Sequence, residues 1–210
     1  MPYNVELTLF VVLATTVGLA FLVWFFYGPV KRMLYRNHTI RMYYRKVYRV
    51  ALDNDFYLIN NFSNRTADLE EFHIDHILIG NKYFYCIRDR YYDGAIAAKE
   101  DNPSWIFFNK DRGRYIPNPL RTNKLRVQRL SLMSDIAEKY CISIVLINDD
   151  CYLTPYESSS DDSFLSSLRE FPKLIEELES RDVDPLDEQA VAIATIDLAQ
   201  LNESSVRRKR

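Results

Sequence analysis

The chain has 210 residues, 48% of them hydrophobic, with 27 Lys and Arg against 29 Asp and Glu. This length accommodates one ordinary domain plus appendages. Cys86, Cys141 and Cys151 form no close pair. An odd number of cysteines without a framework argues against a disulfide-built secreted domain and indicates a reducing compartment. Only five glycines occur, which leaves little room for a glycine-rich nucleotide loop.

The near-zero net charge hides an uneven distribution. Lys31 to Asp150 carry 20 basic against 15 acidic residues, whereas Cys151 to Val206 carry 3 against 13, before a basic cluster at residues 207–210. A basic body with an acidic tail is typical of a protein that binds an anion or masks its own basic surface. A solvated surface with a charged tail is the simpler alternative, and the sequence leaves both open.

An uninterrupted, uncharged apolar run covers Leu7 to Tyr27. Its 21 residues are enough for a helix to cross roughly 30 Å of hydrocarbon. A signal peptide is the alternative, but it needs basic residues before the run, and Glu6 is the only charge there. We therefore expect residues 1–30 to form an uncleaved transmembrane anchor, with its helix at about 7–27.

A basic juxtamembrane segment follows over residues 31–42, beginning with Lys31 and Arg32. Because no base precedes the apolar run, the positive-inside rule predicts a single-pass protein of the cell membrane with its amino terminus outside and its domain in the cytoplasm. Bases near the surface attract anionic head groups by about 1 kcal/mol each. Membrane lipid is thus the first predicted partner.

The residues after this segment alternate between helical and strand-like patterns. Apolar positions recur at helical spacing from Arg41 to Leu52, and Asn118-Pro119 begins a helix that we expect to end at Lys139. A polar loop is expected over Ser63–Glu70. Strands are predicted at Phe56–Phe62, Phe72–Ile79, Tyr83–Asp89, Ala95–Ala98, Trp105–Phe108 and Ile142–Ile147. This order predicts an α/β domain over residues 43–154, with a mixed sheet flanked by helices.

The composition changes after Thr154. Residues 155–210 are predicted to form an acidic, partly helical tail that ends in the basic cluster and could recruit a protein partner. Residues 158–162 read as a linker or a helix cap. The predicted helices of the tail are Phe164–Phe171, Pro172–Leu178 and Pro185–Leu201, the last with Val191, Ala194, Leu198 and Leu201 on one face.

The most informative stretch is the hairpin made by the strands Phe72–Ile79 and Tyr83–Asp89. Asp75 lies inside the first strand, where a charge is costly to bury unless it is paired or binds a metal. The second strand ends in Arg88-Asp89-Arg90. Asp75 is therefore interpreted either as a metal ligand or as a half-buried carboxylate paired with Arg88 or Arg90.

From about Tyr43 to Asp150 the chain resembles the NERD (nuclease-related) domain, a family of the PD-(D/E)xK restriction-endonuclease-like superfamily. The residues that carry the resemblance are Ile74-Asp75-His76-Ile77-Leu78-Ile79, Tyr92-x-Gly94-x-Ile96, Trp105, and Asn118-Pro119-Leu120 with Asn123. The resemblance implies a restriction-endonuclease-like mixed sheet. It also implies a site in which two carboxylates hold Mg²⁺ and a lysine two residues after the second one orients the attacking water.

This chain departs from that pattern in the second strand. Counting back from Gly94 puts Arg88 at the position of the second carboxylate and Arg90 at that of the lysine. Arg88 is a fixed cation that repels Mg²⁺, and Arg90 holds its proton too tightly to act as a base. Asp89 neighbours Arg88 in a strand and is expected on the opposite face, unless a bulge re-aims it.

These observations predict a membrane-anchored NERD-like domain that has lost catalysis, with Asp75, Arg88 and Arg90 as relic positions and no cofactor. Its expected partner is DNA, RNA or a protein. The residues expected to contact nucleic acid are Arg88, Arg90, Arg121, Lys124 and Arg126. Two alternatives stay open. The first is an active Mg²⁺-dependent nuclease that uses Asp75 and Asp89, and the second is a membrane scaffold that binds no nucleic acid.

Overall fold

The computed structural model describes residues 3–65, 71–110, 112–154, 156 and 160–208. The helical side chains outside this description are those of residues 3–6, 28–29, 31–37 and 203–208, which include Lys31 and Arg32 of the basic segment. The chain divides into two compact units, Met1–Met42 and Tyr43–Arg210.

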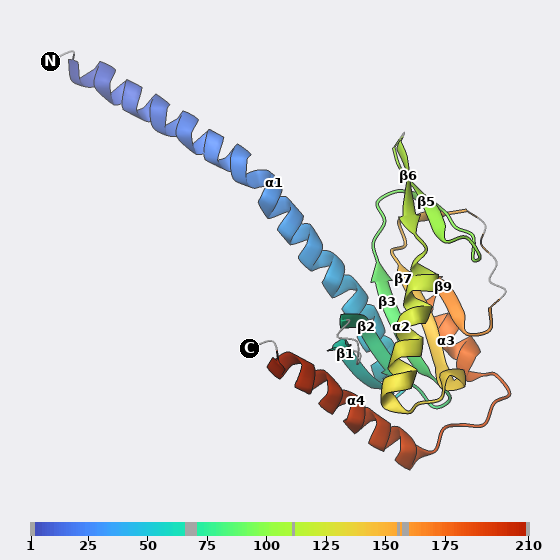
Figure 1. The fold of residues 1–210 in the computed structure, drawn as a ribbon. Helices are drawn as coiled ribbons and strands as arrows, with labels where there is room; N and C mark the ends of the chain where they lie inside the picture. Colours follow the sequence, from blue (N-terminus) through green and yellow to red (C-terminus); the bar gives the residue numbers. More distant parts are fainter. Residues whose placement is uncertain (1–2, 66–70, 111, 155, 157–159, 209–210) are drawn as a thin grey trace. The chain divides into compact units, whose positions relative to one another are not determined.

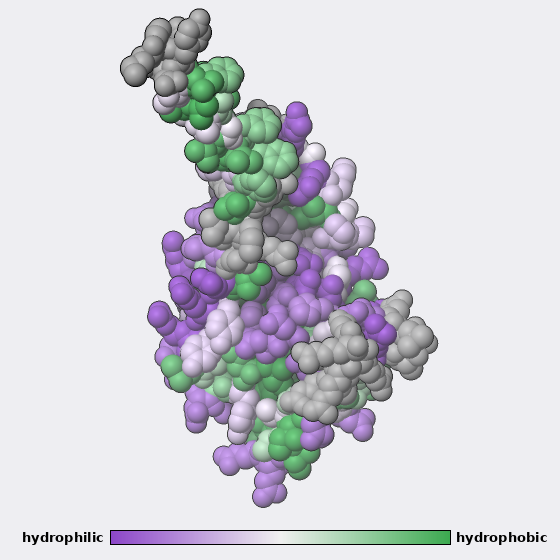
Figure 2. All heavy atoms as spheres, turned by 90° about the vertical axis from the view of Figure 1, so that its left-hand side faces the viewer, coloured by the Kyte–Doolittle hydropathy of each residue, from purple (hydrophilic) through white to green (hydrophobic). Residues whose placement is uncertain are grey.

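The helix α1 (Tyr3–Asp53) provides the first unit and supplies its last residues to the second. Its segment Leu7–Tyr27 has 21 residues, a mean hydropathy of 2.5 and no buried side chains, so by length and composition it could cross a membrane, as predicted. These apolar side chains appear in green along the helix in Figure 2. The hydroxyls of Thr15 and Thr16 donate to helix carbonyls at 2.7–2.9 Å, which satisfies their polar groups inside the apolar segment.

The second unit contains two mixed sheets (Figure 1). Sheet A has the order β1 (Tyr57–Arg65), β2 (Glu71–Ile79), β3 (Phe84–Arg90), β7 (Cys141–Ile147) and β9 (Ser163–Ser167). Its first three strands are antiparallel, whereas β3, β7 and β9 run parallel. Sheet B has the order β6 (Arg112–Pro117), β5 (Ser104–Asn109), β4 (Ala95–Ala97) and β8 (Tyr152–Leu153).

Helices cover sheet A. The helix α2 (Pro119–Ser134) packs mainly on β7, and α4 (Glu188–Arg208) packs on β1. The helix α3 (Phe171–Glu179) is fastened by a 2.6 Å hydrogen bond from Tyr85 of β3 to Glu179. A short 3₁₀ helix, η1 (Glu138–Tyr140), leads into β7. The predicted α/β class, with mixed sheets flanked by helices after one apolar helix, is confirmed.

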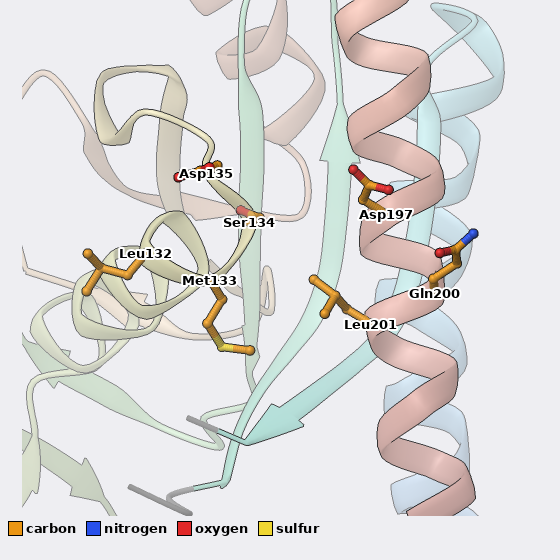
Figure 3. Close-up of a pocket in the computed structure, with 7 residues that line it drawn as sticks. All are labelled: Leu132, Met133, Ser134, Asp135, Asp197, Gln200 and Leu201. Atoms are coloured by element: carbon orange, nitrogen blue, oxygen red, sulfur yellow. The ribbon is translucent and has the colours of Figure 1, made fainter. Parts of the chain in front are cut away.

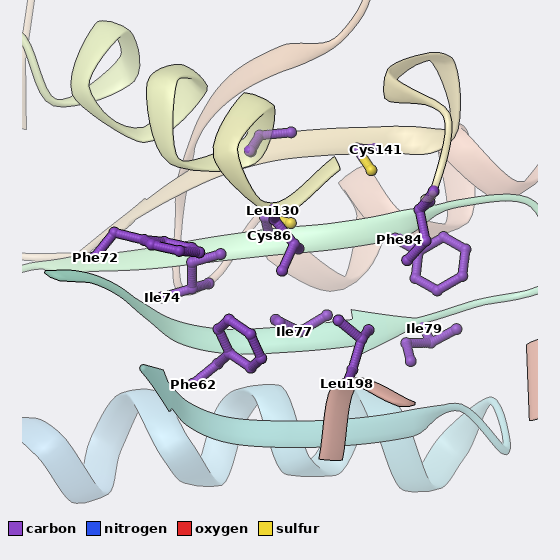
Figure 4. Close-up of a cluster of buried hydrophobic side chains, with 12 residues drawn as sticks. Phe62, Phe72, Ile74, Ile77, Ile79, Phe84, Cys86, Leu130, Cys141 and Leu198 are labelled. Atoms are coloured by element: carbon purple, nitrogen blue, oxygen red, sulfur yellow. The ribbon is translucent and has the colours of Figure 1, made fainter. Parts of the chain in front are cut away.

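The core of sheet A explains why these strands form. Its buried cluster joins Phe62, Ile74 and Ile77 of the first two strands to Leu130 of α2 and Leu198 of α4 (Figure 4). Each such side chain contributes about 1.5–3 kcal/mol when it leaves water. The predicted apolar face of α4 is confirmed, because Leu198 is buried and its neighbours on that face pack against the cluster.

One predicted helix ended at the wrong residue, and another was wrong. The helix from Pro119 ends at Ser134 rather than Lys139, because Asp135 adopts the left-handed conformation with φ of 56° and stops it. Phe164–Phe171 is not a helix, since Ser163–Ser167 is the strand β9, which pairs with the free edge of β7. Tertiary pairing overrides local preference in a segment of this kind.

The remaining differences concern boundaries and short strands. The expected loop Ser63–Glu70 was wrong at its start, because β1 continues to Arg65; residues 66–70 lie outside the described ones. Residues 158–159 of the predicted linker also lie outside the described residues. The strands β6 and β8 were not predicted, since β6 begins with Arg-Gly-Arg and β8 has only two residues. Residues 43–210 form one compact unit, so the predicted tail adds β9, α3 and α4 to the domain.

Candidate functional site: a charged cluster where two strands separate

The charged residues of the predicted hairpin lie where β2 and β3 separate. The pairing of these strands runs from Ile79 opposite Phe84 to His76 opposite Ile87. Beyond that pair, β3 stays paired with β7 through Arg90. The backbone N–H of Asp89 donates instead to the Asp75 carboxylate, at 2.9 Å. A side chain therefore takes the place of a backbone acceptor where the two strands separate.

Both oxygens of Asp75 accept hydrogen bonds. Arg88 Nη1 lies 3.0 Å from Oδ1, and His73 Nε2 lies 3.0 Å from the same oxygen. Oδ2 accepts the Asp89 amide. Arg88 and Asp75 are only 16% and 20% exposed, so their ion pair is weakly screened by solvent. The pairing of Asp75 with Arg88 that the sequence favoured is present.

The pKa values of this pair follow from burial and charge. Burial alone raises the pKa of Asp75, but hydrogen bonds from His73 and the Asp89 amide, together with the charge of Arg88, outweigh it and lower that pKa. Burial lowers the pKa of Arg88, and the charge of Arg90 lowers it as well. The negative charge of Asp75 raises the same pKa but does not outweigh them. Asp75 is therefore held as a carboxylate and Arg88 as its counterion.

Asp89 takes a different partner from Asp75. Its Oδ2 lies 3.0 Å from His76 Nε2, and His76 Nδ1 lies 2.6 Å from Asn60 Oδ1 of β1. Arg88 thus pairs with Asp75, and Asp89 pairs with His76. Because successive side chains of a strand point to opposite faces, the two pairs lie on opposite faces of the sheet. Burial raises the pKa of Asp89, and the nearby Asp75 charge adds to the effect against the opposing influence of His76. The sequence did not identify Asn60.

Three arginines come together at the end of β3. The pKa of Arg126 from α2 is lowered to about 10, mainly by burial and then by the charges of Arg88 and Arg90. Arg126 Nη1 and Arg88 Nε are buried and have no hydrogen-bond partner among the described residues. Arg90 and Arg126 are both partly exposed. The arginine cluster (Arg88, Arg90 and Arg126) therefore has more positive charge than Asp75 balances and donors that remain available.

The other two predicted contact residues lie elsewhere on α2. Arg121 is exposed near the start of the helix. Lys124 makes a 2.9 Å ion pair with Asp162, and both side chains are 42% exposed. The structure therefore brings together Arg88, Arg90 and Arg126 and separates them from the Lys124 ion pair. The helical spacing of Arg126 to Val127 and Leu130 could have indicated that Arg126 lies at the edge of the buried face.

The residues that carried the family resemblance have structural roles. Asn118 caps α2 by accepting from the N–H of Leu120 at 2.9 Å, and Trp105 donates to the carbonyl of Lys99 at 2.8 Å. Asn123 donates to the Cys86 carbonyl of β3 at 2.9 Å. Gly94 has a φ of 154°, and a Cβ there would lie 2.1 Å from the Phe108 carbonyl oxygen. These motifs therefore specify the fold around the cluster.

The donors present do not fit the Mg²⁺ that the superfamily pattern implies. Mg²⁺ requires a nearly octahedral set of oxygen ligands, and here a guanidinium occupies Asp75 Oδ1. In the described part of the chain, no group of three or more His, Cys, Asp or Glu side chains could hold a metal ion. As arranged, this site is suited to anions.

A separate cleft lies at the carboxyl end of α2 (Figure 3). It has a volume of about 620 Å³, and Met133 of α2 faces Leu201 of α4 across it. Its other lining residues are Leu132, Ser134, Asp135, Asp197 and Gln200. None of them belongs to the charged cluster, and the hydroxyl of Ser134 donates to the Leu130 carbonyl of its own helix at 2.7 Å.

The fold and this cluster define a class: an α/β domain with a charged site at the end of a central strand, attached to a helix that could span a membrane. The family model of the nuclease-related domain, NERD, matches residues 42–148, a little over half of the chain. The chain belongs to the NERD family, which confirms the resemblance inferred from residues 43–150. Neither the curated proteins nor the solved structures contain a match.

Proposed function

We propose that this NERD-family protein binds nucleic-acid phosphates without hydrolysing them, at the cytoplasmic face of the membrane in which residues 7–27 are anchored. The observation that carries the proposal is the Arg88–Asp75 ion pair, which places a cation where the superfamily pattern needs a metal ligand. The basic residues after Pro29 support the cytoplasmic orientation.

The arginine cluster supplies the chemistry. Guanidinium groups donate to phosphate oxygens in a bidentate geometry, and such charge-assisted hydrogen bonds are about twice as strong as neutral ones. The unmatched Nη1 of Arg126 and Nε of Arg88 are donors that a phosphate oxygen would satisfy. Asp75 competes with that phosphate, because it accepts from Arg88 in the protein without ligand.

The competition between Asp75 and a phosphate for Arg88 can be tested by removing the charge of Asp75. Asp75→Asn keeps the shape and one acceptor oxygen but removes the charge that holds Arg88. We expect the 210-residue chain in neutral detergent to bind a fluorescein-labelled duplex about tenfold more tightly with this variant, if about 1.4 kcal/mol of the Arg88 interaction passes to the ligand. Arg126→Gln should weaken binding and reduce the log–log salt slope by about one.

A metal-dependent nuclease is the second candidate, because Asp89 Oδ1 is buried without a hydrogen-bond partner in the described ranges and its carboxyl group lies near Asp75. The same variant separates the two functions. In a nuclease that uses Asp75 and Asp89, Asp75→Asn abolishes Mg²⁺-dependent nicking of a plasmid. If the wild-type chain binds no nucleic acid even at low salt, the phosphate-binding function is refuted and a membrane scaffold remains.

A further inference from the structure

Sheet B has one buried face and one open face. Ile96, Trp105 and Phe107 lie on the buried face, where they pack with Val145 and Ile147 of β7. Because successive strand residues point to opposite faces, their sequence neighbours lie on the outer face. That face carries side chains which the core of the domain does not use.

The strand register places these outer residues in two rows across the sheet. The first row is Tyr152, Ala95, Phe108 and Gly113, and the second contains Ala97, Ile106 and Tyr115. The three aromatic rings are exposed, at 69% for Tyr152, 40% for Phe108 and 77% for Tyr115. Ala95 lies between Tyr152 and Phe108, and Gly113 lies on the other side of Phe108, so the first row contains no larger side chain; Ile106 lies opposite Tyr115 in the second row.

The spacing of the rings suits separate bases. Phe108 and Tyr115 are diagonal neighbours on adjacent strands, which puts their positions about 7–8 Å apart. Tyr152 and Phe108 are two strands apart, or about 10 Å, with Ala95 between them. Unstacked bases of a single strand can reach such rings, whereas the bases of a duplex are already stacked on one another.

Cations lie beside this face at the exposed edge of the sheet. The strand β6 is terminal in sheet B, and the β5–β6 hairpin projects from the domain (Figure 1). Lys110 follows β5, and Arg112 and Arg114 lie on β6; all three are exposed. Arg112 and Arg114 alternate with Tyr115 along β6 and so lie on the side of Phe107, whose ring is 5.1 Å from the Arg114 guanidinium. They add positive charge to the edge strand but not to the outer face itself. Rings on a sheet face with cations at its edge match the bases and phosphates of a strand.

We propose that the outer face of sheet B is a base-stacking platform for single-stranded nucleic acid, made by Phe108, Tyr115 and Tyr152. The proposal rests on the proposed function for the kind of ligand and narrows it to single strands. Bases stack on the three rings, and the backbone phosphates contact the basic edge at Lys110. Aromatic side chains on the face of a four-stranded sheet stack two or three bases in a common RNA-binding module.

The experiment compares a pyrimidine-rich single strand with a duplex, both fluorescein-labelled, on the 210-residue chain in neutral detergent. Removing one stacking ring weakens single-strand binding by about 5- to 150-fold. We expect losses in this range from Tyr115→Ala and Tyr152→Ala, with duplex binding unchanged. Tyr115→Trp keeps a stacking ring and should restore single-strand affinity. Tyr57→Ala is the matched control, because Tyr57 is 52% exposed on β1 of the other sheet.

The two proposals fail in different ways. Duplex and single-strand binding that depends on Arg126 but is unchanged in Tyr115→Ala and Tyr152→Ala overturns the platform and leaves the arginine cluster intact. Equal losses for both ligands in Tyr115→Ala also overturn it, since stacking does not apply to paired bases. Single-strand binding lost in Tyr115→Ala but unaffected by Arg126→Gln supports the platform and overturns the proposed role of the cluster. Far-ultraviolet circular dichroism confirms that each variant is folded.

Discussion

Sheet A and sheet B differ in what their faces contact. Every residue of β7 in sheet A is buried, and helices pack on this sheet. Sheet B buries Trp105 and Phe107 on one face and exposes Tyr115 and Tyr152 on the other. The first sheet therefore supplies most of the stability and holds the charged cluster at its edge, whereas the second is free to present side chains. The two sheets meet at the turn after Arg90.

The largest expected difference between the sheets is in stability. Ile77→Ala in sheet A removes a fully buried side chain and leaves a cavity, which should cost about 2–5 kcal/mol of unfolding free energy. Tyr115→Ala in sheet B should stay within about 0.5 kcal/mol, because the ring is 77% exposed. Urea denaturation followed by circular dichroism measures both. Similar losses for the two variants would show that the outer face of sheet B is covered.

The next largest effect is a loss of stability at Gly94, in the segment that connects β3 of sheet A to β4 of sheet B. Gly94→Ala should cost about 1–3 kcal/mol, because its φ of 154° disfavours a side chain and the new Cβ would meet the Phe108 carbonyl. Gly18→Ala is the control, since a Cβ there meets nothing within 4 Å. Proteolysis at the β5–β6 hairpin should increase in Gly94→Ala only. Equal stability of both variants would contradict the close packing at Gly94.

The charged cluster should make stability depend on pH. The pKa of Asp75 is lower in the folded protein than in the unfolded chain, so its ionisation stabilises the fold above the unfolded pKa of about 3.9. That contribution is lost as the pH falls through the lower folded pKa. Asp75→Asn should cost about 1–3 kcal/mol at pH 7 and almost nothing once the wild-type carboxyl is protonated. A difference that does not change with pH would refute the ionic role.

The smallest effect concerns the ion pair that joins α2 to the loop before β9. Lys124 and Asp162 are both 42% exposed, so solvent and salt screen their attraction. A double-mutant cycle with Lys124→Ala and Asp162→Asn should give a coupling of about 0.2–1 kcal/mol that falls in high salt. A coupling well above this range would place the pair among the residues that hold α2 on sheet A.

Local sequence patterns were sufficient for part of the regular structure. The apolar run at 7–27, the strands around Asp75 and the cap at Asn118 were all predicted, because each depends on a short pattern of burial or a single turn. Because a charge inside a strand requires a partner, the sequence predicted either a metal at Asp75 or an ion pair with Arg88 or Arg90, and the structure has the pair with Arg88. The ordered set of the strand around Asp75, Gly94, Trp105 and Asn118-Pro119 was enough to indicate the family.

Only the tertiary structure decided which distant residues meet. Arg126 joins Arg88 and Arg90 because α2 packs on β7 and β3, and no sequence periodicity relates a helix position to the end of a strand. Asn60 reaches His76 through the pairing of β1 with β2. The strand at Ser163–Ser167 forms because β7 offers a free edge. Local propensity determines most of the elements, whereas long-range pairing and packing determine which side chains become neighbours and, at Ser163–Ser167, the element itself.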